Sequence, residues 1–333
     1  MTHKVAINGM GRIGRATLKI LMDTPDLELV AVNDIVPIET IEYLLKYDTV
    51  YGKYKKNVKI QGSNLVIDGK PISYNQERDP TKLPWSKLQV ELVFECTGIF
   101  TKTEDLRKHI QAGAKYVVLS APTKSSDMPT IVHGVNSPEG KPVIFSCASC
   151  TTNCITPVVE IMDRRIGVEK AIMTTVHAYT STQSLVDGPV AKDVSRGRAA
   201  ALNFVPTTTG AAIATTLALP NLKGRFDGVA IRGPVPVGSI ADITFITKKD
   251  TSAEEIEKIF REEAETERYK GILGVADDPI VSSDIIGDPR ASVVDPRMTT
   301  VVSGNLVKIM TWYDNEWGYC HQMVREAIKT LRN

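Results

Sequence analysis

Residues 5–14 read Val-Ala-Ile-Asn-Gly-Met-Gly-Arg-Ile-Gly, an apolar run followed by a glycine-rich turn that opens a helical pattern. In a strand–turn–helix of this spacing, Gly9 allows a tight turn, Gly11 lets a pyrophosphate approach the backbone, and Gly14 lets the helix pack closely on the strand. The helix N-terminus then offers N–H groups to the phosphates. The turn therefore predicts a dinucleotide-binding domain.

Asp34 follows the next apolar run, 20 residues after Gly14. A carboxylate at this position accepts hydrogen bonds from the adenosine ribose hydroxyls, and its charge repels a 2′-phosphate. We therefore expect NAD as the cofactor and leave NADP open as an alternative.

The first 150 residues alternate short apolar runs with amphipathic ones, which predicts an α/β domain with a doubly wound parallel sheet. Helical patterns extend from Ala16 to Met22 and from Glu104 to Ala112, and the more polar residues 50–90 are expected to form a smaller side element. The predicted strands are apolar at successive positions, as in a sheet covered on both faces. They are Val5–Ile7, Leu29–Val32, Leu92–Phe94, Val117–Leu119 and Val143–Phe145.

The pattern changes after about residue 150, where a helix is predicted from Cys150 to Arg165 with Pro157 inside it. A capping box at Ser252–Glu255 begins another helix. Residues 178–205 carry few periodic signals, and a loop of that length is usually functional. Several of the predicted strands alternate apolar with polar residues, which favours an antiparallel sheet. They are Ala171–Val176, Val229–Ile231, Asp242–Thr247 and Leu306–Trp312.

Length and charge limit the classes of function. A chain of 333 residues is typical of two domains, and a formal net charge of +1 provides no overall field for nucleic acid or an anionic membrane. No apolar run approaches the roughly 18 residues of a membrane span. The N-terminus reads as a strand rather than a cleavable leader, and five scattered cysteines do not suggest a disulfide framework. We expect a reduced, cytosolic protein without nucleic-acid or membrane partners.

Three of the cysteines, Cys147, Cys150 and Cys154, lie within one short segment. They could ligate a metal or an iron–sulfur cluster, although no nearby residue completes four ligands. Cys147 and Cys150 could form a redox pair. The interpretation we favour is a single nucleophile, Cys150, because Ser149 is a good N-cap and the helix dipole in the first turn favours a thiolate.

A cysteine nucleophile usually works with a base, and His177 closes the strand predicted from Ala171 to Val176. Its position is compatible with contact to the sulfur. A structural histidine at a strand end fits the spacing equally well, so the residues alone leave this choice open.

The complete chain resembles phosphorylating glyceraldehyde-3-phosphate dehydrogenases. Seven motifs occur in the family's order, of which the cysteine-centred and the C-terminal ones are the most specific: INGMGRIGR, LLKYDTVYG, CTGIF, ASCTTNC, HAYTSTQ, RAAALNFVPTTTGAA and WYDNEWGY. The resemblance implies a Rossmann domain at residues 1–150, completed by a C-terminal helix at 317–333. It also implies an α+β catalytic domain at 151–316 with a mostly antiparallel sheet, an S-shaped loop at about 178–205, and a homotetramer.

The same resemblance implies roles for individual residues. Cys150 matches the family's nucleophile and His177 its base, while Thr180, Thr182 and Arg232 match the site for the substrate's own phosphate. The site for inorganic phosphate is matched by Ser149, Thr151, Arg196, Thr209 and Gly210. Beside the glycines of the turn, cofactor contacts are matched by Arg12, Ile13, Asp34, Arg78, Ser120 and Asn315, the last binding the nicotinamide carboxamide.

The implied reaction oxidises D-glyceraldehyde 3-phosphate with NAD and inorganic phosphate to 1,3-bisphosphoglycerate through a Cys150 thioester, in glycolysis and gluconeogenesis. The chain departs from the family pattern at Cys147, which replaces an asparagine, and at Val235 and Val237, which replace polar residues near Arg232. Two alternatives stay open: an erythrose-4-phosphate dehydrogenase, and a non-catalytic nucleotide-binding relative.

Overall fold

A computed structural model describes residues 2–138, 140–190 and 193–332. The chain forms two compact units. The first contains the residues up to His133, Ser137–Ala148 and the residues from Met323 onward, and the second contains Gly134–Asn136 and Ser149–Gln322. The sequence prediction placed the corresponding boundaries at residue 150 and residue 317.

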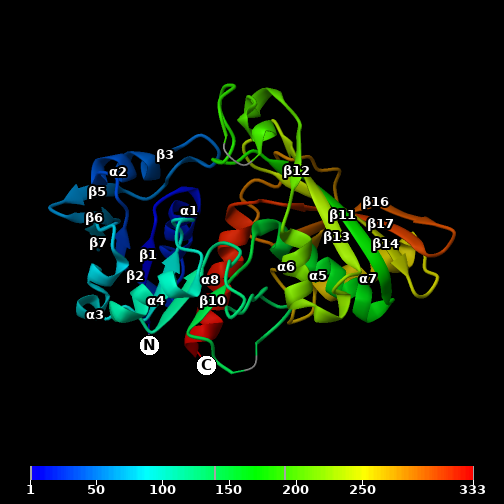
Figure 1. The fold of residues 1–333 in the computed structure, drawn as a ribbon, viewed down its shortest axis with the longest axis horizontal. Coiled ribbons are helices and arrows are strands. Elements are labelled where there is room, and N and C mark those ends of the chain that lie inside the picture. Colours follow the sequence, from blue (N-terminus) through cyan, green and yellow to red (C-terminus); the bar gives the residue numbers. More distant parts are fainter. Residues whose placement is uncertain (1, 139, 191–192, 333) are drawn as a thin grey trace. The chain divides into compact units, whose positions relative to one another are not determined.

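The first unit is built on an eight-stranded sheet with the order β10-β9-β8-β1-β2-β7-β6-β5 (Figure 1). Neighbours from β10 to β7 pair in parallel, whereas β6 and β5 add an antiparallel edge. The five predicted strands are confirmed within this sheet. The strands are β1 (His3–Asn8), β2 (Leu27–Asn33), β5 (Val58–Gln61), β6 (Asn64–Ile67), β7 (Lys70–Asn75), β8 (Leu92–Glu95), β9 (Tyr116–Leu119) and β10 (Ile144–Ser146).

The prediction of a separate side element at residues 50–90 was wrong. Three strands of this stretch extend the main sheet, and β7 pairs in parallel with β2. Polar residues occur here because the edge is half exposed: the outward positions of β5 and β7 are polar while Leu65, Ile67 and Ile72 are fully buried. Only the β-ribbon of β3 (Tyr47–Asp48) and β4 (Gly52–Lys53) stays outside the sheet.

Buried apolar residues on consecutive positions explain why β1 is central. Val5, Ala6 and Ile7 are each fully buried, which requires cover on both faces of the sheet. The helices and 3₁₀ turn of this unit are α1 (Arg12–Leu21), α2 (Ile38–Lys46), η1 (Pro80–Lys82), α3 (Trp85–Leu88), α4 (Thr103–Gln111) and the later part of α8 (Trp317–Arg332). On α8 the side chains of Val324, Ile328 and Leu331 follow one another at helical spacing; Val324 is buried and the other two are half-buried.

The second unit has a seven-stranded, mostly antiparallel sheet with the order β12-β13-β11-β14-β17-β16-β15. Only the β11–β13 and β15–β16 pairs are parallel. The predicted strands are confirmed, and Ser239–Thr247 alternates buried with half-buried residues along its length. The strands are β11 (Val168–Ala178), β12 (Val205–Thr208), β13 (Phe226–Gly233), β14 (Ser239–Thr247), β15 (Leu273–Val275), β16 (Ser292–Val302) and β17 (Leu306–Tyr313).

Helix α5 (Cys150–Arg165) has the predicted bounds, with Pro157 inside it. Its residues Ile155, Val158 and Ile161 are fully buried in the core that also contains Phe245 of β14. The remaining helices are α6 (Ala211–Ala218) and α7 (Ala253–Ala264), with 3₁₀ turns η2 (Val194–Gly197), η3 (Ala200–Leu202) and η4 (Pro220–Leu222).

The capping box of α7 is confirmed in one half. Ser252 Oγ accepts a hydrogen bond from Glu255 N at 3.2 Å, whereas the Glu255 carboxylate accepts from the Thr251 hydroxyl.

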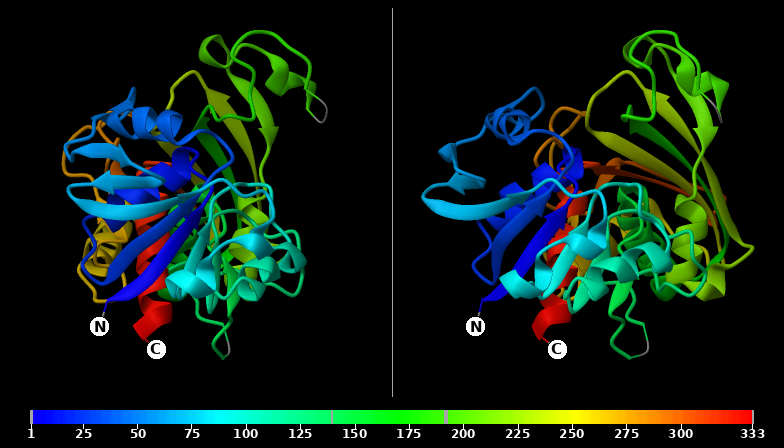
Figure 2. Two further views of the ribbon diagram at one scale, coloured as in Figure 1. Left: turned by 90° about the vertical axis from the view of Figure 1, so that its left-hand side faces the viewer. Right: turned by 60° about the vertical axis from the view of Figure 1, so that its left-hand side comes forward.

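Among its described residues, 179–190 and 193–204, the segment between β11 and β12 has two 3₁₀ turns and no longer helix or strand, as expected for the predicted loop at 178–205. Figure 2 shows it as a green excursion from the strands of its own unit. Gly188 N donates to Gly197 O, and Arg198 pairs with Asp187, so hydrogen bonds within the loop give it a defined path. Residues 191 and 192 lie outside the described residues.

Candidate functional site

The glycine turn has the geometry that the sequence predicts. Gly9 has φ +95°, and a Cβ there would lie 2.6 Å from Thr97 N. A Cβ on Gly14 would collide with Gly9 O, so only glycine lets α1 approach the turn. A Cβ on Gly11 would meet nothing within 4 Å, which leaves space beside the helix N-terminus for a ligand. The turn is thus packed against the backbone at Gly9 and Gly14 and open to solvent or ligand at Gly11.

A cavity of about 500 Å³ lies beside this turn, at the carboxyl ends of β1, β2 and β8. Asp34 faces it directly after β2; its Oδ2 accepts from Met10 N at 2.6 Å, and its Oδ1 accepts from Val36 N. The exposed side chain of Arg78 lines the same cavity. The lining residues are Asn8, Gly9, Gly11, Asn33, Asp34, Ile35, Val36, Glu77, Arg78, Cys96, Thr97, Ile99 and Phe100.

The other predicted cofactor residues of this unit lie near the ends of its strands and helices. Arg12 begins α1, and its Nη1 donates to Asp48 at 2.8 Å. Ile13 is half-buried in the same turn. Ser120 follows β9, and its N–H donates to Glu95 O. None of these three lines the cavity beside the glycine turn.

Helix α5 begins as the sequence predicts. Ser149 is the N-cap, and its Oγ accepts from Thr152 N at 3.2 Å, which places Cys150 in the first turn. The preceding residue, Ala148, has φ +56°, a conformation that costs free energy for a residue with a side chain and often accompanies functional sites. The chain therefore turns sharply into the helix at the point where the thiol is presented.

His177, at the end of β11, contacts this thiol: its Nε2 lies 3.3 Å from Cys150 Sγ. Its Nδ1 lies 2.7 Å from Ala178 O and 2.6 Å from Arg232 Nη1. A carbonyl only accepts and a guanidinium only donates, so Nδ1 cannot serve both. We assign the proton to Nδ1, donating to Ala178 O, because Arg232 Nη1 reaches the same carbonyl at 3.1 Å. Nε2 is then free to accept the thiol proton.

Burial is the largest influence on the pKa values of His177 and Cys150. Burial, and after it the positive charge of Arg232, lowers the pKa of His177 to about 3. Burial raises the pKa of the Cys150 thiol, and Arg232 together with the hydrogen bonds of Thr151 offsets part of that increase. The resting pair at neutral pH is therefore a thiol beside a neutral imidazole, which is a base without a bound proton. The prediction of a thiolate from the helix dipole was wrong, because the effect of burial on the pKa of Cys150 is larger.

Arg232 lies near the end of β13 next to this pair and is half-buried, and the burial of its guanidinium lowers its pKa. Its Nε is buried without a hydrogen-bond partner among the described residues, so a donor is left for an acceptor from outside the chain. The Thr180 and Thr182 hydroxyls lie 2.9 Å apart, and Tyr179 N donates to Val235 O. The segment that carries the departures from the family pattern thus lies beside the predicted substrate-phosphate residues.

The residues predicted to bind inorganic phosphate lie in three places: the turn η2, the residues just before α6, and the start of α5. Arg196 Nε and Nη2 donate to Thr207 Oγ1 in β12 at 3.1 and 2.9 Å, and its charge is near enough to lower the pKa of Arg232 further. Thr209 Oγ1 accepts from Ala211 N, and Gly210 is the N-cap of α6, where helix N–H groups favour an anion. In α5, Thr151 Oγ1 hydrogen-bonds Tyr313 OH at 2.9 Å.

Asn315 lies in the second unit, directly after β17 and Asp314. Its Oδ1 accepts from Gly238 N at 3.2 Å and from the Ser239 hydroxyl at 3.0 Å. These two donors fix the amide so that Nδ2 is the group left to donate.

Sequence reasoning missed residues that hold the predicted ones in place. Tyr313 OH bridges Thr151 and Thr175, and its ring meets the His177 ring edge-on at 5.9 Å. Asp193 accepts from Thr207 and pairs with Arg196 at 3.3 Å. Tyr313 stands inside the WYDNEWGY motif, whose specificity was the only signal available.

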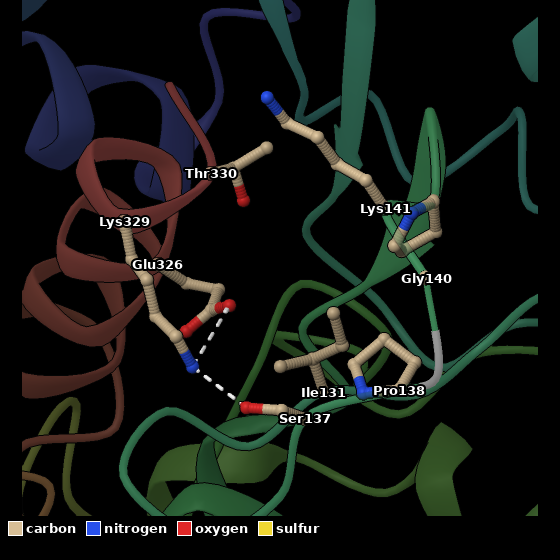
Figure 3. A pocket seen from close by; sticks show the side chains of 9 residues that line it. Ile131, Ser137, Pro138, Gly140, Lys141, Glu326, Lys329 and Thr330 are labelled. Atoms are coloured by element: carbon tan, nitrogen blue, oxygen red, sulfur yellow. Dashed lines mark hydrogen bonds and ion pairs between the residues drawn. The ribbon is translucent and has the colours of Figure 1, made fainter. Parts of the chain in front are cut away.

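A smaller cavity of about 130 Å³ in the first unit contains none of the predicted residues (Figure 3). Lys329 lines this cavity, where its Nζ donates to Ser137 Oγ and forms an ion pair with Glu326. The charge of Lys329 is therefore already paired. Within residues 2–138, 140–190 and 193–332, no three His, Cys, Asp or Glu side chains converge as metal ligands. In the same ranges, no helix is long and apolar enough to cross a membrane.

Comparisons with known proteins agree with this architecture. A family model described as "Glyceraldehyde 3-phosphate dehydrogenase, NAD binding domain" matches residues 3–103, and one described as the C-terminal domain of the same enzyme matches residues 149–315. The chain is 46% identical to a glyceraldehyde-3-phosphate dehydrogenase of Zymomonas mobilis, covering 100% of this chain and 99% of that protein. It is 48% identical to glyceraldehyde-3-phosphate dehydrogenase 2 of Streptomyces avermitilis and 46% identical to the glyceraldehyde-3-phosphate dehydrogenase of Geobacillus stearothermophilus. Each alignment covers 97% of this chain and 97% of the relative.

A dinucleotide fold in one unit and a thiol–imidazole pair in the other define an NAD-dependent oxidoreductase. The two family models together match well over half of the chain. The chain belongs to the glyceraldehyde-3-phosphate dehydrogenase family.

Proposed function

We propose that this chain is a phosphorylating glyceraldehyde-3-phosphate dehydrogenase in which Cys150 is the nucleophile and His177 the general base. The observation that carries the proposal is the 3.3 Å contact between Cys150 Sγ and His177 Nε2 at the start of α5. A thiol is activated when a neighbouring base accepts its proton during attack, and the neutral imidazole satisfies that requirement.

The cavity beside the glycine turn fits the adenosine part of NAD. It is open at Gly11, and Asp34 presents a carboxylate for the ribose hydroxyls. Asn315, with Nδ2 left as a donor, suits the nicotinamide carboxamide. When bound, NAD accepts the hydride that converts the Cys150 hemithioacetal into a thioester. Arg12, Ile13, Arg78 and Ser120 remain proposed contacts to the same cofactor.

The chain's own residues account for the other steps. Cys150 Sγ attacks the aldehyde carbon while its proton passes to His177 Nε2, and the imidazolium returns this proton to the resulting alkoxide, which gives the hemithioacetal. When the hydride leaves and the carbonyl re-forms, the hemithioacetal hydroxyl gives its proton back to His177 Nε2. Inorganic phosphate then attacks the thioester carbon, the carbon–sulfur bond breaks, the acyl phosphate is released, and the Cys150 thiolate takes the proton from His177.

Two anion sites are needed because the substrate carries one phosphate and a second one attacks. We place the substrate's phosphate at Arg232, Thr180 and Thr182, since Arg232 holds an unused buried donor. Inorganic phosphate is placed at Arg196, with further donors from Ser149, Thr151, Thr209 and Gly210. The positive charge of Arg196 lowers the pKa of Arg232, so the two guanidinium groups lie near each other. This supports two neighbouring anion sites, one at each arginine.

The experiment is an assay of NAD reduction with glyceraldehyde 3-phosphate and with erythrose 4-phosphate, each with and without inorganic phosphate. We expect turnover of the triose substrate that requires phosphate. Phosphate-independent turnover would show that the chain performs the non-phosphorylating reaction instead. A preference for the tetrose would favour erythrose-4-phosphate dehydrogenase activity.

We also propose a homotetramer. The second unit exposes large apolar side chains on the loop at 178–205 and on the sheet next to it: Leu185 is 81% exposed, Leu202 84% and Phe204 70%. Ile172 of β11 and Val229 of β13, on adjacent strands, are 60% and 50% exposed. An apolar surface of this extent marks a protein interface. Light scattering of the purified protein tests the subunit number, and a monomer at micromolar concentration excludes the proposal.

We place the enzyme in the cytoplasm, because none of the five cysteines, all within the described residues, forms a disulfide and a thiol nucleophile needs reducing conditions. The reaction serves glycolysis in the oxidative direction and gluconeogenesis in reverse. Measuring both directions with NAD and with NADP tests the cofactor and the direction together.

A further inference from the structure

A buried carboxylate lies directly beneath the cavity beside the glycine turn. Glu95 is the last residue of β8, and its side chain is fully buried. Two other polar residues end the neighbouring strands, Asn8 on β1 and Asn33 on β2, and they are 1% and 4% exposed. Burying three polar side chains at one edge of a sheet costs free energy unless each is hydrogen-bonded.

Four hydrogen-bond donors converge on the side chain of Glu95. Trp85 Nε1, which can only donate, lies 3.0 Å from His109 Nδ1, so Nδ1 accepts and the proton of His109 is on Nε2. Nε2 then donates to Glu95 Oε2 at 3.1 Å, and Asn8 Nδ2 donates to the same oxygen at 2.6 Å. Thr97 donates to Oε1 through both its N–H and its hydroxyl. Glu95 therefore accepts four hydrogen bonds, two at each carboxyl oxygen.

This network reaches the wall of the cavity in two directions. The Thr97 hydroxyl accepts from Ile99 N at 3.1 Å, so Glu95 holds the turn at residues 97–99 through Thr97. The backbone N of Thr97 lies 2.6 Å from where a Cβ on Gly9 would be. Asn8 Oδ1 accepts from Asn33 Nδ2 at 2.7 Å, and Asn33 in turn exchanges hydrogen bonds with the backbone of Glu77. Asn8, Asn33, Glu77, Thr97 and Ile99 all line the cavity.

We propose that Glu95 is a positioning residue for the dinucleotide: its carboxylate, held by His109 and Asn8, sets the wall of the adenosine cavity. The proposal rests on the assignment of that cavity to NAD. Glu95 touches neither the reacting atoms nor the thiol, so its influence is on cofactor affinity and not on the chemical step.

The test starts with Glu95→Gln, which keeps the shape but replaces an acceptor by an NH₂ group. Thr97 retains its acceptor if the amide oxygen faces it, and the NH₂ group then opposes the Asn8 and His109 donors. We expect the Kd for NAD, and equally for ADP-ribose, to rise roughly 10- to 100-fold, because buried donors are left unpaired. We expect kcat at saturating NAD to stay within about threefold of the parent.

The double variant Asn8→Asp/Glu95→Gln supplies the decisive comparison. It moves the carboxylate to position 8, where it can accept from the new amide at position 95 and from His109 Nε2, which lies 3.5 Å from Asn8 Nδ2. We expect Asn8→Asp alone to weaken NAD binding, because it places two carboxylates together, and the double variant to recover at least tenfold over Glu95→Gln. A double variant no better than the single one would overturn the proposal.

Glu263→Gln is the matched control. Glu263 is another buried carboxylate, bound by Arg164 and Arg165 in the second unit. We expect it to lower the melting temperature without changing the Kd for NAD. An equal loss of NAD affinity in this control, or an unchanged Kd in folded Glu95→Gln, would contradict the inference. If the parent protein itself binds no NAD, the proposed function fails instead.

Should Glu95→Gln not fold, Thr97→Val decides. This change is close to isosteric, and it removes the hydroxyl link between Glu95 and Ile99 N. A raised Kd for NAD and ADP-ribose with kcat retained supports the proposal, and unchanged affinity refutes it.

Discussion

His177 Nδ1 and Arg232 Nη1 lie 2.6 Å apart, and both reach the carbonyl oxygen of Ala178. The guanidinium therefore contributes to keeping the imidazole neutral, while the other ring nitrogen contacts the thiol of Cys150. Parallel pairing of β11 with β13 produces this arrangement, because His177 and Arg232 are register partners at the ends of the two strands. One positive group thus acts on both the imidazole and the thiol.

Replacing His177 tests its proposed role as the general base. We expect His177→Asn to lower kcat by roughly 10²- to 10⁴-fold, the usual contribution of a positioned general base. Steady-state kinetics and thermal unfolding of the same preparation measure the two effects separately. A variant that loses mainly stability and keeps its turnover would identify His177 as a structural histidine.

The buried imidazole also makes stability depend on pH. With a folded-state pKa of about 3 and an unfolded-state value of about 6.5, His177 takes up its proton only in the unfolded chain between these values. Its contribution to stability is present above pH 6.5 and is lost as the pH falls towards 3. Linkage gives a loss of about 1.5 kcal/mol between pH 6.5 and pH 5. Urea unfolding should show a smaller loss in His177→Asn; identical losses in both proteins would contradict the lowered pKa.

Removing the guanidinium should change the reactivity of the thiol. Arg232 lowers the pKa of Cys150 against the larger, opposing effect of burial, so Arg232→Leu is expected to raise that pKa further. The midpoint of the pH dependence of iodoacetamide labelling should then move to higher pH, with slower labelling at pH 7. A midpoint that stays in place or moves down would mean that other groups set the thiol's ionisation.

The Asp34 carboxylate is expected to discriminate against NADP. Asp34→Gly should increase kcat/KM for NADP relative to NAD, because the negative charge facing the 2′-phosphate is removed. The same change removes the acceptor for Met10 N, so some loss of NAD affinity accompanies it. Asp34→Asn separates the two effects, since its amide oxygen can still accept from Met10 N. If the ratio is unchanged in both variants, residues other than Asp34 determine the preference.

Much of the fold was predictable because its signals are local. The buried strands, the turn at Gly9, and the N-cap Ser149 each depend on residues adjacent in sequence. The edge strands β5 and β7 were missed because half-exposed strands lack a continuous apolar run, whereas β6 was missed although Leu65–Ile67 form such a run. The 11-residue strand β16 was also missed; it contains Pro296, and its register with β17 shifts between Asp295 and Thr300.

In the candidate site, too, the features that depend on neighbouring residues were predictable and the contacts between distant residues were not. Cys150 could be predicted from its own helix start, whereas the sequence alone left His177 undecided, because its contact with the thiol joins residues 27 positions apart. The partners of Glu95 lie up to 87 positions away, and nothing in the sequence indicates that Asn8 and His109 meet there.

Mass spectrometry of the acyl-enzyme tests the central claim most directly. Protein mixed with glyceraldehyde 3-phosphate and NAD, without inorganic phosphate, should gain one acyl group per chain, located by peptide mapping on Cys150 and released when phosphate is added. An adduct on another side chain, or NADH formation at the full steady-state rate in Cys150→Ser, would contradict the account.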